Sequence, residues 1–317
     1  MMGMRVIKTA AAGLAAIYTA IYLGLEPSLS AGLIAILGVE VTRMKNLKSA
    51  FIRMMASALG LLFASLIFVL FGFELWTLSL FVLITYPVLS RIQLKDGIVT
   101  SSVLVFHVFE RKEVTLELLG NEIMLLITGL GWAIVVNFLY MPKEEGRLSA
   151  LQKSTARQFS VIFTEMAHTL RDPAHVWNGE QLLQADKDIE LGLLRSDIDR
   201  ENRPWGYERY WRTYFEMRRQ QLDSIQQMLV LIAFVYEKVP QGELLAEVFE
   251  QLAEEVTSDV YLGIAERELT LLEERYREMP LPASRGEFEV RAALLELLHE
   301  LERFLRIAKR RKKQKAE

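Results

Sequence analysis

The chain of 317 residues contains no cysteine, which excludes a disulfide framework, a thiolate metal site and a cysteine nucleophile. It also lacks a glycine-rich loop that could cradle a phosphate and the strand-turn-helix motif of serine hydrolases. The apolar part holds no spaced cluster of histidine, aspartate and glutamate. The sequence therefore favours neither an enzyme nor an ATP-driven pump, and we expect no cofactor.

Charged residues are scarce in residues 1–142, which hold 10 of the 37 Lys and Arg and 8 of the 40 Asp and Glu. This part contains six runs without a formal charge, which we interpret as membrane helices. No small-residue cleavage site follows the first run and five more come after it, so a signal peptide is not indicated. The runs cover residues 9–25, 27–39, 54–73, 75–90, 97–109 and 123–142.

Two of these runs are short. Residues 27–39 and 97–109 have 13 residues each, enough for about two thirds of a ~30 Å hydrocarbon core. Either flanking residues and a thinner bilayer complete them, or they are partial helices beside a transport site. The run lengths are 17, 13, 20 and again 16, 13, 20. That order is compatible with a 3+3 inverted repeat, a device of transporters, and equally with coincidence.

The basic residues predict the orientation of the membrane part. With a cytoplasmic N-terminus, eight Lys and Arg residues of this part, together with Lys143 and Arg147 directly after it, lie on the cytoplasmic side, and only Arg111 and Lys112 lie outside. Cytoplasmic loops normally carry this excess. We therefore expect an all-α, multi-pass protein of the cell membrane, with six transmembrane helices and both ends in the cytoplasm.

Residues 143–308 are expected to form a cytoplasmic helical bundle. Their apolar residues recur at spacings of three and four, and no strand pattern interrupts them. Proline and glycine at 172–179, 203–206, 239–242 and 279–286 divide them into five helices. Two expected core stripes are Leu148, Leu151, Thr155, Phe159, Ile162, Met166 and Thr169, and Trp211, Phe215, Leu222, Ile225, Leu229, Ile232 and Tyr236.

The last residues, 309–317, form a basic tail with six positive charges and one negative charge. Such a tail either adheres to anionic membrane lipid or is a disordered, solubilising end. A nucleic-acid partner is not expected, because residues 143–308 carry 21 basic and 31 acidic residues.

The motif Glu-x-x-His occurs twice, as Glu165/His168 and Glu296/His299. Di-iron carboxylate bundles use this spacing. At ~100° per residue, both histidines point away from the apolar stripes of their helices. We therefore expect solvated polar faces and no metal site.

Two ionisable residues in the membrane part are candidates for proton coupling. Glu40 ends a short apolar run, where it could carry a proton or form a boundary ion pair with Arg43. His107 lies three residues before an outer loop, where it could titrate or simply extend its ring towards the interface.

Tyr86 and Asn137 are uncharged candidates. Tyr86 precedes Pro87, whose kink could free a carbonyl to line a cavity, although membrane helices also tolerate proline without a function. Asn137 lies near the end of the sixth run, after Gly129 and Gly131. Glycines allow close helix approach, so a hydrogen bond across a helix contact is the favoured interpretation of this amide.

Arg53 begins the third span, followed by Ser57 and Gly60 on nearly the same helical face. A guanidinium, a hydroxyl and bare backbone together suit an organic carboxylate. The alternative is that Arg53 is one more positive-inside residue, paired with Glu40.

The stretches FIRMMASALGLL (51–62) and GLGWAIVVN (129–137) resemble the aromatic acid exporter family. Members related to fusaric acid resistance proteins carry R-x-x-G-T-x-x-G at the first place. Arg53 and Gly60 match that pattern, whereas Gly-Thr has become Ala56-Ser57. Gly, Ala and Asn at the second place match Gly129, Ala133 and Asn137, and six spans followed by a helical cytoplasmic domain match the family's branch with one membrane unit.

The resemblance implies efflux of aromatic or other organic carboxylates, driven by the proton gradient. Related plant malate channels make an organic-anion channel the alternative within transport, and a membrane-anchored sensor or scaffold fits the same spans. A homodimer is expected, because relatives with two membrane units per chain suggest that symmetry completes the pathway. The candidate residues are Arg53, Ser57, Gly60, Tyr86 and Asn137 for substrate, and Glu40 and His107 for protons.

Overall fold

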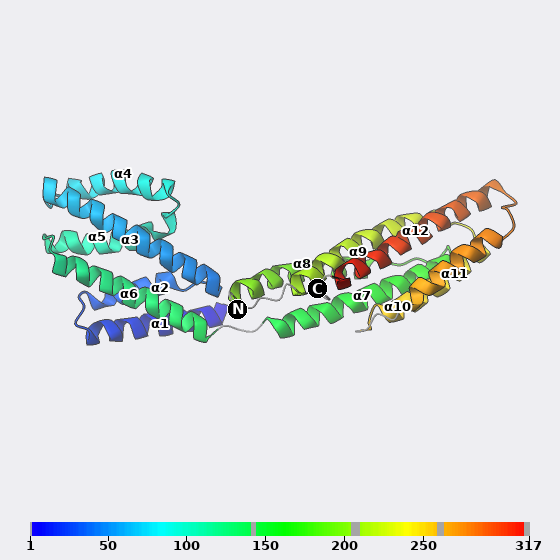
Figure 1. The fold of residues 1–317 in the computed structure, drawn as a ribbon, viewed down its shortest axis with the longest axis horizontal. Helices are drawn as coiled ribbons and strands as arrows, with labels where there is room; N and C mark the ends of the chain where they lie inside the picture. Colours follow the sequence, from blue (N-terminus) through cyan, green and yellow to red (C-terminus); the bar gives the residue numbers. More distant parts are fainter. Residues whose placement is uncertain (1, 141–143, 204–209, 259–262, 314–317) are drawn as a thin grey trace. The chain divides into compact units, whose positions relative to one another are not determined.

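The computed structural model describes residues 2–140, 144–203, 210–258 and 263–313 (Figure 1). Every regular element in these residues is a helix, with twelve α-helices and one short 3-10 helix. The all-α prediction is therefore confirmed. The helices form two compact units, residues 1–142 with 201–206 and residues 143–200 with 207–317.

The first unit has one α-helix for each of the six uncharged runs. A 3-10 helix, Lys95–Gly97, leads into the fifth. Among the described residues, two of the six, the third and the last, are long and apolar enough to cross a membrane, and the second and fourth are shorter apolar helices. The helices are α1 (Met2–Tyr22), α2 (Ser28–Gly38), α3 (Arg43–Phe71), α4 (Leu75–Arg91), α5 (Ile98–Arg111) and α6 (Leu116–Leu139).

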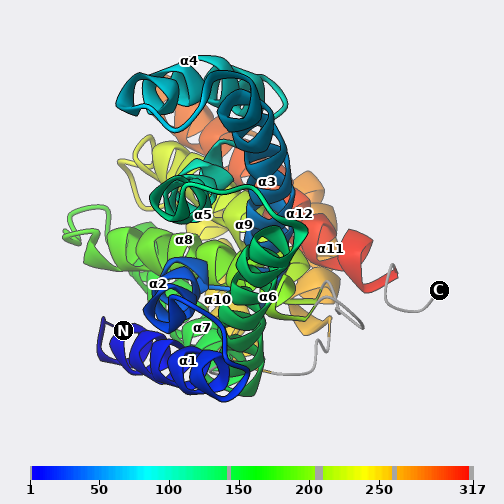
Figure 2. The same cartoon turned by 90° about the vertical axis from the view of Figure 1, so that its left-hand side faces the viewer.

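Loops of a few residues make consecutive helices of this unit run in alternating directions (Figure 1). Lys8 near the start of α1 donates to Asn137 near the end of α6, so these two helices are antiparallel. Seen end-on, the helices follow one another from α1 through α2 and α6 to α5, α3 and α4, with α4 at the edge (Figure 2). The alternation agrees with the expected six spans, which remain a proposal.

The short helix α2 packs against α1, α3, α5 and α6, while its residues Leu29, Leu33 and Ile36 are exposed. Its residues Ala31, Ile34 and Ala35 are fully buried. Other helices therefore cover one part of its apolar surface, and the rest of that surface is left exposed.

Small residues bring the helices of this unit close together. A Cβ atom at Gly129 would lie 2.6 Å from the carbonyl oxygen of Ala31, so α6 touches the backbone of α2. At Gly131, no atom of the described residues lies within 4 Å of the same position. The expectation of close helix approach is thus met at the first glycine and wrong for the second.

In its described residues, the second unit is a bundle of six helices rather than the expected five. They are α7 (Glu145–Arg171), α8 (Glu180–Asn202), α9 (Tyr210–Ile232), α10 (Pro240–Glu255), α11 (Ile264–Glu278) and α12 (Arg285–Lys313). The last two residues of α8, Glu201 and Asn202, belong to the first unit. The expected fourth helix is divided into α10 and α11. Gly263, with φ of +69°, ends the gap, because glycine adopts this left-handed conformation without strain.

The break expected at 239–242 was also placed too late. Pro240 is the first residue of α10, a position where its missing N–H costs no hydrogen bond. Helix α9 already ends at Ile232, and Tyr236, expected in the core, is 52% exposed. Part of the break at 203–206, residues 204–206, and the end of the basic tail, residues 314–317, lie outside the described residues.

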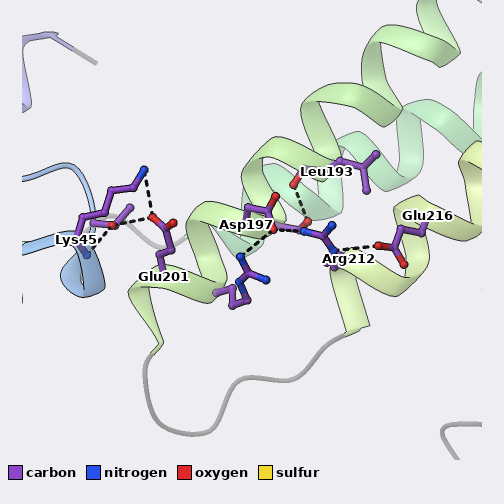
Figure 3. A network of polar contacts seen from close by, with 9 residues as sticks. Lys45, Leu193, Asp197, Glu201, Arg212 and Glu216 are labelled. Atoms are coloured by element: carbon purple, nitrogen blue, oxygen red, sulfur yellow. Dashed lines mark hydrogen bonds and ion pairs between the residues drawn. The ribbon is translucent and has the colours of Figure 1, made fainter. Parts of the chain in front are cut away.

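The core of this unit joins helices that are distant in the sequence. Phe163 of α7 stacks on Phe249 of α10 with ring centroids 6.0 Å apart, and meets Phe304 of α12 edge-on at 5.2 Å. At the surface, Asp197 of α8 accepts a hydrogen bond from Arg212 of α9, which also donates to Glu216 (Figure 3). Aromatic contacts therefore hold the centre of the bundle, while ion pairs cover it.

Candidate functional site

A histidine and a glutamate form a buried pair in the first unit. His107 of α5 has its Nδ1 atom 2.8 Å from Oε2 of Glu122 on α6, and its Nε2 atom 3.0 Å from Oγ of Ser30 on α2. The side chain of Glu122 is fully buried, and that of His107 is 14% exposed. Three helices thus place an imidazole between a carboxylate and a hydroxyl, which is an arrangement that can hold or pass a proton.

Glu122 is a candidate that the sequence analysis missed. It lies just before the uncharged run, which begins only at Ile123, and was therefore outside the predicted helix. Helix α6 begins at Leu116, so Glu122 lies nearly two turns inside it, facing the other helices. Thr115 gives the missing signal, since its hydroxyl accepts from the backbone N–H of Leu118, as expected of an N-terminal cap. For His107, the pairing with Glu122 replaces the alternative of a ring that reaches only for the interface.

Polar groups continue from this pair to the surface. Asn121 beside Glu122 donates to the backbone carbonyl of Glu26 and accepts from its N–H at 3.1 Å. The side chain of Glu26 forms an exposed ion pair with Arg111, at 2.8 Å. The pair His107–Glu122 is therefore linked to one end of the first unit by a short series of polar side chains.

Arg53 lies at the opposite end, between α3 and α5. Its Nε atom donates to Ser49 at 3.1 Å and its Nη1 atom donates to Thr100 at 2.8 Å. Gly97 makes this contact possible, because a Cβ there would lie 3.0 Å from the Cα of Arg53. The half-buried guanidinium is thus held in one orientation by two hydroxyls.

The residues expected to accompany Arg53 differ in what surrounds them. Ser57 is fully buried, and its hydroxyl has no hydrogen-bond partner among the described residues. At Gly60 the bare backbone is already approached closely by α5, because an added Cβ would lie 1.8 Å from Oγ of Ser101. Gly60 therefore serves the contact between α3 and α5 in this structure, since Ser101 fills the place proposed for a ligand.

Tyr86 of α4 points towards α5, where its hydroxyl lies 2.7 Å from Oγ of Ser102. Ser102 in turn donates to the carbonyl of Ile98 at 2.8 Å. The buried hydroxyls of Thr85 and Ser101 nearby in the sequence have no partner among the described residues. Hydroxyl groups therefore collect along the α4–α5 side of this unit.

Asn137 is fully buried and joins three segments. Its oxygen accepts from Nζ of Lys8 on α1 at 3.2 Å, and its nitrogen donates to the carbonyl of Thr42 at 3.2 Å. Thr42 caps the start of α3, and its hydroxyl also donates to Glu201 at 2.9 Å. Lys45 forms an ion pair with the same carboxylate at 3.5 Å (Figure 3). These contacts agree with a connecting role of the amide.

Glu40 is half-buried in the loop between α2 and α3. Neither pairing considered for it, with Arg43 or with Arg53, is formed within the described residues. Arg43 instead donates to the carbonyls of Phe138 and Asn202, at 2.8 Å and 3.3 Å.

The candidate residues thus fall into two groups at opposite ends of the first unit. His107 and Glu122 lie beside the start of α2, at Ser30. Asn137 and Asn46 lie beside its end, where Asn46 donates to the carbonyl of Gly38 at 2.8 Å. Eight residues of helix separate Ser30 from Gly38, which corresponds to about 12 Å. One end offers proton-binding groups, and the other, with Arg53, offers positive charge.

Comparison with known proteins supports a transporter. Residues 1–141 match the family model of aromatic acid exporter family member 1, and residues 145–309 match the model of the C-terminal domain. YqjA of Bacillus subtilis strain 168 is 33% identical over 303 residues, covering 96% of this chain and 94% of that protein.

Two further proteins are less similar. The UPF0421 protein OB2406 of Oceanobacillus iheyensis is 26% identical over 207 residues, covering 62% of this chain and 57% of that protein. A crystal structure of a membrane protein from Clostridium difficile 630 is 21% identical, with a TM-score of 0.45, over 52% of this chain and 96% of that chain. Because the two family models together match nearly the whole chain, as the motifs around Arg53 and Asn137 indicated, the chain belongs to the aromatic acid exporter family.

Proposed function

We propose that this protein exports aromatic or other organic carboxylates across the cell membrane and that inward proton movement drives the export. The family supports a transporter in a membrane. In this proposal the six helices of the first unit span the membrane with both ends in the cytoplasm, and the second unit is cytoplasmic. The excess of basic residues on one side supports this orientation.

The observation that carries the proposal is the buried pair of His107 and Glu122. An ionisable group in a membrane is costly to bury and is retained mainly where it has a function. Here the carboxylate is fully buried and the imidazole contacts it directly, at 2.8 Å. One proton can be held on either group, and its loss leaves a net negative charge between the helices. Proton uptake and release would therefore change how α5 packs against α6.

We place the carboxylate site at Arg53. Ser49 and Thr100 hold the guanidinium from one side, so its remaining N–H groups are pre-oriented for a substrate oxygen. Ser57, one turn further along α3, has a buried hydroxyl without a partner in the described part of the chain and is the second candidate contact. Tyr86 and Asn137 are proposed as more distant contacts, whereas Gly60 would contribute only if Ser101 moved.

We propose a homodimer that uses the edge of the first unit. Helix α4 lies at this edge (Figure 2), and a hollow between α4 and α5 is lined by Leu78, Ser79, Val82, Leu83 and Phe106. A second copy on this face would bring the Tyr86 hydroxyl region of both chains to a shared interface. A monodisperse monomer that transports normally in nanodiscs would contradict it.

Flux into liposomes tests the function. The purified protein is reconstituted, and uptake of labelled benzoate is measured with and without a pH gradient. We expect saturable flux that the gradient accelerates, and loss of this acceleration in His107→Gln and Glu122→Gln. Glu117→Gln is the matched control, because Glu117 is an exposed carboxylate in the first turn of the same helix.

Each other outcome selects another function. Conductance that does not saturate and does not respond to the pH gradient indicates the anion channel. No flux of any organic anion, with correctly folded protein, indicates a sensor or scaffold. Gradient-driven flux that is unchanged in both His107→Gln and Glu122→Gln would leave transport intact but remove the pair from proton coupling.

A further inference from the structure

Three potential metal ligands converge at the end of α7 in the second unit. Glu165 and His168 lie on one face of this helix, and His175 follows in the loop before α8. One ligand atom from each of the three lies within 4.8 Å of the others. Two of the four histidines of the chain therefore meet beside a carboxylate.

The local sequence explains why His175 turns back towards α7. Asp172 is the first residue after the helix, and Pro173 cannot continue it. The N–H of Asp172 donates to the carbonyl of His168, and the N–H of His175 donates to the carbonyl of Asp172, both at 2.8 Å. This turn places Nε2 of His175 at 2.6 Å from Oε2 of Glu165, ten residues earlier.

The motif Glu165/His168 was expected to be a solvated polar face without a metal, because it points away from the core. The structure leaves His168 exposed, as expected, but the third ligand comes from the loop and not from another helix. The rings of His168 and His175 are 5.5 Å apart and nearly perpendicular, so their nitrogen atoms can face a common point. The three residues therefore form a cluster on the surface of the bundle, which the helix motif alone does not indicate.

We propose that Glu165, His168 and His175 bind one first-row transition-metal ion of the Zn²⁺ type. Zinc accepts imidazole nitrogen at about 2.0–2.1 Å and carboxylate oxygen at about 2.0–2.2 Å. Ligand atoms around one tetrahedral ion are then about 3.4 Å apart, so small side-chain rotations bring these three into place. Two imidazoles and one carboxylate are a donor set that suits zinc better than Mg²⁺ or Ca²⁺, which prefer oxygen.

The surrounding charges permit a cation. Arg171 lies one turn after His168, but its guanidinium is engaged by Glu243 and Glu250, so its charge is balanced. With three protein ligands, the fourth position of the ion stays open to water or another ligand. Metal binding would fasten the loop of residues 172–179 to α7, which makes this loop responsive to metal supply.

The test is metal binding to the full-length protein in detergent, purified without a polyhistidine tag and stripped with a chelator. Zn²⁺ is titrated in competition with a chromogenic chelator. We expect one ion per chain, and at least about a tenfold weaker affinity in each of Glu165→Gln, His168→Ala and His175→Ala, since loss of even an outer-shell partner costs about 10–100-fold. Excess Mg²⁺ should not displace the ion.

His299→Ala is the matched control, because Glu296 and His299 form the same motif on the exposed face of α12 without a third ligand from a loop. Its affinity should equal that of the unaltered protein, and far-ultraviolet circular dichroism should be equal for all variants. Co²⁺ in place of Zn²⁺ gives a second readout, with visible absorption bands that disappear in His168→Ala/His175→Ala. Absence of binding, or equal loss in His299→Ala, would overturn the proposal.

Discussion

The contact between α6 and α2 can be tested by adding one methyl group at either of two glycines. Gly129 and Gly131 are two residues apart on the same helix, so a change from glycine to alanine alters the helix propensity equally at both positions. At Gly129 an alanine Cβ would lie 2.6 Å from the carbonyl oxygen of Ala31 and 2.8 Å from two carbon atoms of Ile34. At Gly131 an alanine Cβ would have no neighbour within 4 Å in the part of the chain that the structure describes. The two substitutions therefore differ only in the neighbouring helix.

The expected size of the difference follows from the distances. Two non-bonded heavy atoms are in ordinary contact at about 3.4 Å or more, so the alanine Cβ of Gly129→Ala must push α2 away by roughly 0.8 Å. Overpacking of this kind costs about 1–3 kcal/mol of folding free energy. In an otherwise free helix position, alanine in place of glycine gains up to about 1 kcal/mol. We expect Gly129→Ala to destabilise the protein by about 1–2 kcal/mol and Gly131→Ala to be neutral or slightly stabilising.

The measurement is thermal unfolding of the purified protein in a mild detergent, followed by tryptophan fluorescence. A difference of about 2 kcal/mol corresponds to a Tm difference of about 4–8 °C for chains of this order of length. The ranking is the informative result, because both variants share detergent, length and chemistry. Equal Tm values, or a lower Tm for Gly131→Ala, would refute the packing of α6 on α2 through Gly129.

Two further predictions concern charged groups. Arg53→Lys keeps the charge but loses the planar guanidinium, so carboxylate flux should fall at least about tenfold at equal membrane abundance, as expected for one lost charge-assisted hydrogen bond. The control Arg91→Lys, at an exposed site on α4, should transport normally. Unchanged flux in both variants would leave Arg53 only a role in topology. The fragment 143–308 should fold alone as a helical bundle. In this bundle, hydrogen bonds from Arg171 lower the pKa of the Glu250 carboxyl below its ordinary 4.5. Glu250 then stabilises the fold above its ordinary pKa and loses this effect as the pH falls through the lowered value. Glu250→Gln should therefore cost less than about 1 kcal/mol at pH 7, since the carboxylate is half exposed. In urea unfolding, the difference from the unaltered fragment should disappear as the pH falls through the lowered pKa.

Residue patterns alone predicted much of the fold. The six uncharged runs each became a helix, and most residues of the apolar stripes from Leu148 and Trp211 are buried or half-buried. Helix periodicity is a local property, so it can be read without knowledge of the partners. The error in the second unit, five helices for six, arose because the gap before Gly263 lacks proline, and a single glycine is a weak signal of a break.

The candidate site was predicted only in part. Arg53, His107 and Asn137 were recognised as polar residues in an apolar setting, and the structure gives each of them buried or half-buried partners. Glu122 was left outside the predicted sixth helix, because the absence of charge was used to delimit the helices. A charged residue that is neutralised by a partner inside the protein cannot be told from a surface charge by composition.

The sequence by itself determined that the chain is all-helical, that its first 142 residues are apolar and its remainder water-like, and which residue types are available for chemistry. The tertiary structure decided which of them meet: Glu122 with His107, Ser101 with Gly60, and His175 with Glu165. Helix formation depends on neighbours within four residues. Contacts between helices depend on their rotation and relative shift, which many weak packing interactions fix together, so no short stretch of sequence contains them.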